Sequence, residues 1–145
     1  MKPSIQFHYI FDKRFFFPHR KNLKKILLAL FKKEECSIET VSYIFCSDAF
    51  LLIINQEFLK HNSFTDVITF QLSDQAQPII SDIYISVDRI LYNSKFLGVS
   101  FTNELHRVIF HGALHLCGFN DNNKKERTII RKKEDFYLDQ YLRST

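Results

Sequence analysis

The pair His111 and His115, followed by a glycine and a carboxylate, constrains this chain more than any other feature. Both histidines lie in the segment HGALHLCGFND, residues 111–121. On a helix, positions i and i+4 share one face with Cβ atoms roughly 5–6 Å apart, so both imidazoles can bind one ion at about 2.0–2.1 Å. Gly118 can end the helix in the left-handed conformation, after which Asp121 can turn back to the same ion. Two histidines, one carboxylate and a fourth position for water indicate one catalytic Zn²⁺ per chain.

An HxxxH pair alone occurs in many helices that bind no metal, so its surroundings decide the interpretation. The segment 102–117 is apolar on nearly every side, which is typical of a buried helix. One polar stripe crosses this segment and consists of Glu104, Arg107, His111 and His115. Buried polar groups need partners, and a metal ion supplies one. We therefore interpret the stripe as a metal-binding face.

The length and composition favour one globular domain over residues 1–145. The longest apolar runs are far too short to span a bilayer, so no membrane association is expected. The N-terminus has polar and charged residues where a signal peptide needs an apolar core, which predicts a cytoplasmic protein. Three cysteines without CxxC spacing indicate neither a disulfide framework nor a cysteine zinc site.

A net charge of +4 and a pI near 9.0 favour an anionic partner. The positive residues form two clusters, one near each end of the chain. The first comprises Lys13, Arg14, Arg20, Lys21, Lys24 and Lys25, and the second comprises Lys124, Lys125, Arg127, Arg131, Lys132 and Lys133. Such clusters are usually solvated helix faces. Near a metal site they also indicate nucleic acid, and here single-stranded RNA, as a partner.

Hydrophobic periodicity predicts an α+β fold, with a single mixed sheet of about four strands packed with about five helices. The expected strands cover 4–10, 38–46, 66–70 and 82–87, and the expected helices 22–35, 50–59, 89–96, 102–117 and 124–141. Asp48 is a candidate N-cap for the second helix. The helix at 102–117 is zincin-like because it carries both histidines on one face.

The segment 111–121 strongly resembles the YbeY family of bacterial metal-dependent endoribonucleases, whose members carry HGxLHLxGYDH. This chain matches the family pattern at His111, Gly112, Leu114, His115, Leu116 and Gly118, with Phe119 at the tyrosine position. Upstream, Ile54-Asn55 and the segment TDVITF at 65–70 resemble the family's LN and TDVLSF segments, and SDIYIS at 81–86 resembles its GDIxIS strand. The resemblance implies an enzyme that matures ribosomal RNA.

Two departures from the family pattern affect the site. The third histidine of the family corresponds to Asp121, so the resemblance implies a His–His–Asp site, and carboxylate is an accepted zinc ligand. The arginine that the family places six residues before the threonine corresponds to Leu59. Such an arginine is suited to pairing with phosphate. His61 and Arg107 are candidates to supply this charge to the catalytic site.

The leading hypothesis is a zinc-dependent, single-strand-specific endoribonuclease in rRNA processing. The resemblance implies 16S rRNA 3′-end maturation, ribosome quality control and contact with the ribosome. The nucleophile would be water on the ion held by His111, His115 and Asp121. A metallopeptidase is disfavoured because Gly112 stands where its catalytic glutamate is needed. An iron oxygenase with two histidines and a carboxylate stays open, as does a non-catalytic ribosome-associated metal-binding assembly factor.

Overall fold

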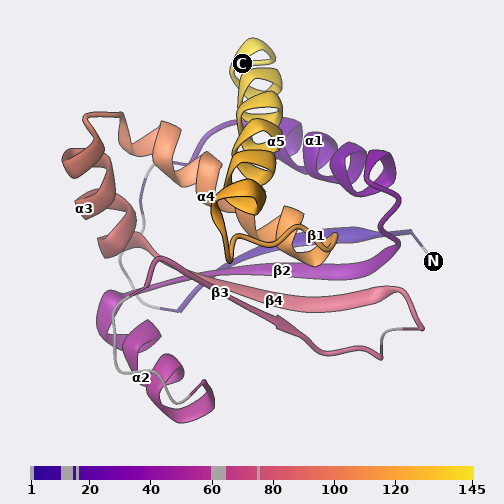
Figure 1. Ribbon diagram of the computed structural model, residues 1–145, viewed down its shortest axis with the longest axis horizontal. Coiled ribbons are helices and arrows are strands. Elements are labelled where there is room, and N and C mark those ends of the chain that lie inside the picture. Colours follow the sequence, from indigo (N-terminus) through magenta and orange to yellow (C-terminus); the bar gives the residue numbers. More distant parts are fainter. Residues whose placement is uncertain (1, 11–14, 16, 60–64, 75) are drawn as a thin grey trace.

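The computed structural model describes residues 2–10, 15, 17–59, 65–74 and 76–145. In these ranges the chain forms four strands and five helices (Figure 1). They are, in chain order, β1 (Ser4–Tyr9), α1 (Arg20–Lys33), β2 (Ile38–Cys46), α2 (Asp48–Phe58), β3 (Val67–Gln71), β4 (Ile79–Ser86), α3 (Val87–Leu97), α4 (Phe101–Leu116) and α5 (Lys124–Arg143). None of the helices in the described ranges is long and apolar enough to cross a membrane.

The four strands form one mixed sheet in the order β1-β2-β4-β3. β1 and β4 both run parallel to β2, so Val41 of β2 pairs with Ile5 on one side and Ser81 on the other. β3 is antiparallel to β4, with Ile68 opposite Tyr84. The predicted α+β class and single mixed sheet are therefore confirmed.

The two faces of the sheet are covered by different helices. α1, α4 and α5 lie together on one face, and α2 lies on the other (Figure 1). Side chains of β4 alternate accordingly: Ile83 and Ile85 belong to the core under α4, whereas Tyr84 packs against the cluster beneath α2. The buried Tyr43 hydroxyl of β2 donates a hydrogen bond to the Ile109 carbonyl at 2.8 Å. This contact fixes the middle of α4 against the sheet.

The N-cap of α2 lies one residue before the position that the sequence suggested. Ser47, not Asp48, is the N-cap, because the Ser47 hydroxyl accepts a hydrogen bond from the Phe50 amide at 3.1 Å. The Asp48 carboxylate instead accepts hydrogen bonds from Arg89 Nη2 at 2.7 Å and Ser86 Oγ at 3.1 Å. The prediction of an Asp48 cap was wrong, because a tertiary contact engages its side chain and links the starts of α2 and α3.

Candidate metal centre

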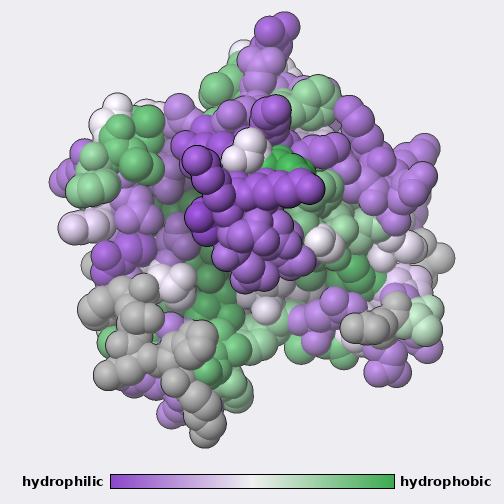
Figure 2. Space-filling view, in the orientation of Figure 1, coloured by the Kyte–Doolittle hydropathy of each residue, from purple (hydrophilic) through white to green (hydrophobic). Residues whose placement is uncertain are grey.

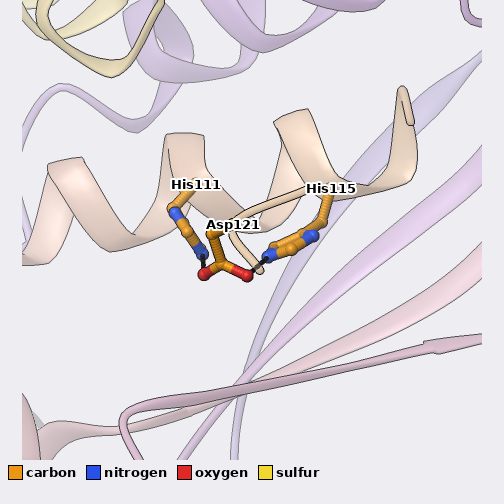
Figure 3. Close-up of side chains that lie close together, drawn as sticks. All are labelled: His111, His115 and Asp121. Atoms are coloured by element: carbon orange, nitrogen blue, oxygen red, sulfur yellow. Dashed lines mark ion pairs between the residues drawn. The ribbon is translucent and has the colours of Figure 1, made fainter. Parts of the chain in front are cut away.

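The buried helix α4 presents His111 and His115 on one face, at the edge of its packed core. The residues that flank these histidines, including Phe110, Ala113 and Leu114, are fully buried against the sheet and the other helices. Packing of these apolar side chains sets the rotation of α4 about its axis. Both imidazoles consequently point away from the core towards the loop that follows the helix (Figure 3).

A glycine turn returns the chain to the two histidines. Gly118 has a φ of 94°, in the left-handed region, and the Phe119 amide donates to the Leu114 carbonyl at 3.1 Å. This i to i−5 hydrogen bond is typical of a helix terminated by glycine. On the far side of the loop, the Asn123 side chain caps α5 by accepting from the Glu126 amide at 2.9 Å. The loop that carries Asp121 is thus fixed at both ends.

Donor atoms of His111, His115 and Asp121 all lie within 4.8 Å of one another. His111 Nε2 is 3.5 Å from Asp121 Oδ2, and His115 Nε2 is 3.7 Å from Asp121 Oδ1 (Figure 3). Ligands on a tetrahedral zinc ion, each about 2.0–2.1 Å from the metal, lie about 3.3 Å apart. The two distances from histidine to Asp121 are therefore within a few tenths of an ångström of this spacing, and the chemistry of the three donor groups fits a zinc ion.

A buried carboxylate on α5 orients the first histidine. Glu134 is only 5% exposed in its side chain, and its Oε2 accepts a hydrogen bond from His111 Nδ1 at 2.5 Å. An ionised carboxylate can only accept, so the hydrogen is on Nδ1 and the lone pair of His111 Nε2 faces Asp121. Arg107 in turn donates to Glu134 Oε1 at 3.2 Å and pairs with Asp135 at 2.9 Å. The Arg107 guanidinium is thus held by two carboxylates.

The electrostatic surroundings shift the pKa values of His111 and His115 in opposite directions. Burial alone would lower the pKa of His111, but the hydrogen bond and charge of Glu134, with Asp121 and Asp66, raise it overall. The pKa of His115 is lowered, first by burial and then by the positive charge of His111. Burial raises the pKa of the nearby Asp66 carboxyl. A lowered pKa keeps His115 in the neutral form that binds a metal.

Two clefts meet at these side chains, and both are lined by Asp66, His111 and Asp121. The larger, of about 700 Å³, lies between α4 and α5. The smaller, of about 590 Å³, lies along β3 and reaches the end of α2 at Leu59. An extended ligand can therefore pass over the three donor groups from one cleft into the other.

The predicted site residues do not all lie at the metal centre with their side chains available. It brings His111, His115 and Asp121 together, as their spacing predicts. Arg107 lines the larger cleft, but its charge is engaged by Glu134 and Asp135. His61 lies outside the described residues.

The two basic clusters also differ in position. Lys124, Arg127, Arg131 and Lys132 of the C-terminal cluster line the larger cleft. No described residue of the N-terminal cluster lines either cleft. Among the described residues of the two clusters, those of the C-terminal cluster are therefore the ones placed to act on a ligand at the metal centre.

Sequence reasoning missed Glu134 and Asp66. Glu134 is 23 residues beyond His111, in a helix whose many charges make no single carboxylate stand out. The signal available for Asp66 was its position in the TDV segment, immediately before β3. Tertiary packing brings both carboxyl groups to the site.

Comparisons with known proteins agree with this arrangement. A family model described as "Endoribonuclease YbeY" matches residues 12–142. A protein of that name from Cytophaga hutchinsonii is 41% identical over 138 residues, which cover 95% of this chain and 96% of the relative. Another from Karelsulcia muelleri is 39% identical over 131 residues, covering 90% of this chain and 92% of the relative.

A solved structure shares the fold as well. The solution structure of a Thermotoga maritima protein superposes with a TM-score of 0.64 at 28% identity, covering 95% of this chain and 89% of that one. The family resemblance of the metal-binding segment is thereby confirmed over most of the sequence. The chain belongs to the Endoribonuclease YbeY family.

Proposed function

We propose that this chain is a zinc-dependent endoribonuclease that cleaves single-stranded RNA during maturation of the 3′ end of 16S rRNA and in ribosome quality control. Membership in a family of endoribonucleases supports RNA as the substrate class. The observation that carries the proposal is the convergence of His111, His115 and Asp121 at zinc-ligand spacing, where two clefts meet. Contact with the ribosome and action as one domain over residues 1–145 belong to the same proposal.

The three donor side chains would hold the ion at the point where the two clefts meet. A bound divalent cation lowers the pKa of a coordinated water and polarises a phosphoryl oxygen. Glu134 holds His111 in the tautomer whose Nε2 can bind the ion. The turn at Gly118 holds Asp121 opposite both imidazoles. These residues keep the ligands oriented before substrate arrives, so little reorganisation is needed.

Selectivity for single strands is supported by the form of the substrate path. The backbone of a single strand can bend through a groove and expose its phosphates, whereas a duplex is rigid. In this protein the donor groups lie at a junction between clefts and not on a protruding surface. We therefore expect a single-stranded oligoribonucleotide to be cut faster than the same sequence in a duplex.

Metal analysis and RNA cleavage on the same purified sample test the proposal. We expect one zinc ion per chain and cleavage that stops on addition of a chelator and resumes with Zn²⁺. His115→Ala should lose both the ion and cleavage, whereas replacement of His8, exposed on β1, should lose neither. A chain that binds zinc but leaves single-stranded RNA intact would instead be a non-catalytic assembly factor. This second function is favoured by Leu59, which lines the smaller cleft at the position where the family carries an arginine suited to pairing with phosphate.

A further inference from the structure

The larger cleft carries a row of positive side chains on one wall. We call it the α5 cation row, and its members are Lys124, Arg127, Arg131 and Lys132. We infer that the α5 cation row binds the phosphates of the RNA strand on one side of the cleavage point, while the cleft along β3, whose described lining has no lysine or arginine, takes the other side. This inference rests on the proposed function and adds to it the path and polarity of the substrate.

The two clefts that meet at the metal centre differ sharply in charge. Besides the row, the larger cleft contains Arg107. Among the described residues, the smaller cleft is lined by no lysine or arginine. Besides Asp66, Asp121 and the two histidines at the metal centre, its polar residues are Asn55, Thr65, Thr69 and Gln71. A polyanion is attracted most strongly to the surface where positive charge is concentrated. The phosphates are therefore drawn to the α5 side, and the uncharged hydrogen-bonding groups beside β3 suit sugars and bases.

The row is available to a ligand, unlike Arg107. All four of its members are exposed. Within the described ranges, Lys124, Arg131 and Lys132 form no ion pair with another residue, and Arg127 donates only to the Asp121 carbonyl at 3.5 Å. Arg107, in contrast, is held by Glu134 and Asp135. Unpaired cations release counterions when phosphates replace them, which favours binding.

Acidic groups in the same cleft oppose the row only weakly. Glu104 is only 5% exposed, so its carboxyl group lies beneath the surface that the row presents to solvent. Asp121 is committed to the candidate ion site. The charge of Glu134 is paired with that of Arg107. Positive charge therefore dominates the part of the cleft that faces solvent.

The row also has the length and the position that a strand-binding surface requires. Residues 124–132 of a helix span about 12 Å at about 1.5 Å per residue, which is enough for more than one phosphate. The row begins three residues after Asp121 and ends two residues before Glu134, which contacts His111, so it runs alongside the metal centre on α5. Hydrophilic side chains gather over α5 in Figure 2. A strand anchored there would lead its next phosphodiester over the His–His–Asp group.

Removal of three charges from the row tests the inference. The variant Lys124→Gln/Arg131→Gln/Lys132→Gln leaves Arg127 in place, because Arg127 contacts the backbone of Asp121. The probe is a fluorescein-labelled oligothymidylate, which an endoribonuclease does not cut and whose phosphates match those of RNA. For the zinc-loaded full chain we expect affinity to fall about tenfold, and the slope of log K against log salt to flatten by about 2, because each single-strand phosphate contact contributes about 0.7.

A matched control removes the same charge from α1. Lys21→Gln/Lys25→Gln/Lys32→Gln changes three exposed lysines that line neither cleft, so binding should stay close to that of the wild type. On oligouridylate, the row variant should raise KM with little change in kcat, since uniform binding is lost. Melting temperatures of both variants verify folding.

Two results would overturn the inference: an unchanged affinity and salt slope in the row variant, or an equal loss in the α1 control. If the row variant keeps oligonucleotide binding but loses binding to phosphatidylserine vesicles, the row serves a membrane surface and the inference is likewise wrong. Because binding is measured without cleavage, the outcome is separate from that of the proposed function. A chain that binds through the row but never cuts RNA would refute only the latter.

Discussion

The Nδ1 atom of His111 on α4 lies 2.5 Å from Oε2 of Glu134, a carboxylate buried on α5. A hydrogen bond of this kind fixes the tautomer and ring orientation of a histidine that binds a metal through its other nitrogen. Arg107 holds the second oxygen of the same carboxylate. The candidate metal centre thus depends on packing between two helices as well as on its three donor side chains.

Glu134→Ala should weaken zinc binding by about 10- to 100-fold, as loss of an orienting partner commonly does. Competition with a chromophoric chelator measures this affinity without reference to cleavage. Asp139→Ala is the matched control, because Asp139 is an exposed carboxylate of the same helix, 59% accessible, and its ion pair is with Arg143 on the far turn of α5. A folded Glu134→Ala protein with wild-type zinc affinity would show that Glu134 has no orienting role.

Asp121→Ala should lose the ion, whereas Asp121→His should retain it with the three histidines typical of the family. Asn120→Ala provides the control, because it changes the neighbouring residue without removing a candidate ligand. Neutral histidine leaves more net positive charge at the ion, so bound water becomes more acidic and the pH profile of cleavage should shift downward in Asp121→His. Metal retained by Asp121→Ala and lost by Asn120→Ala would mean that the turn presents a different ligand.

Gly112→Ala should lower both stability and zinc affinity. A Cβ atom at this position would lie 3.0 Å from Ile83 Cγ2 and 3.3 Å from its Cδ1, and Ile83 is fully buried in β4. Overpacking costs about 1–3 kcal/mol, against a gain of about 1 kcal/mol in helix propensity. The displaced backbone would also carry His111 with it.

A double-mutant cycle with Ile83→Ala measures this clash. The double variant should unfold at a higher free energy than the sum of the single effects predicts, because the smaller side chain makes room for the new methyl group. Additive effects in urea unfolding would show that the two residues do not compete for space.

Acid should destabilise the fold through His106. This side chain is 1% exposed, stacks on Tyr141 at 4.0 Å between ring centroids, and has its pKa lowered to about 4 by burial. The unfolded chain takes up the proton at a pKa of about 6.5, so the stabilisation is present above that pH and is lost as the pH falls towards 4. The loss amounts to about 3 kcal/mol at most.

His106→Gln removes this titration while keeping a polar side chain. Urea unfolding from pH 7 to pH 4, with a chelator present to exclude metal release, should show the wild-type advantage shrinking as the pH falls. Parallel curves for the two proteins would contradict the assignment to His106.

Local patterns in the sequence were sufficient for most secondary structure. The strand at 38–46 was predicted with both ends correct, and the helix at 102–117 differs by one residue at each end. β4, in contrast, begins at Ile79, three residues before its predicted start at 82. Its first residue pairs with Ile38 of β2, and such a partner distant in the chain leaves no local periodicity to detect.

The metal ligands were also accessible from the sequence, because they lie within 11 consecutive residues. Helix periodicity places His111 and His115 on one face, and the glycine turn determines where Asp121 goes. The order of strands, the ion pairs that occupy Arg107 and the approach of Glu134 to His111 came only from the tertiary structure. So did the difference in charge between the two clefts. Spacing along a chain fixes geometry over a few turns of helix. These contacts instead depend on how α5 packs against α4, and that packing is decided by the burial of apolar side chains over the whole core.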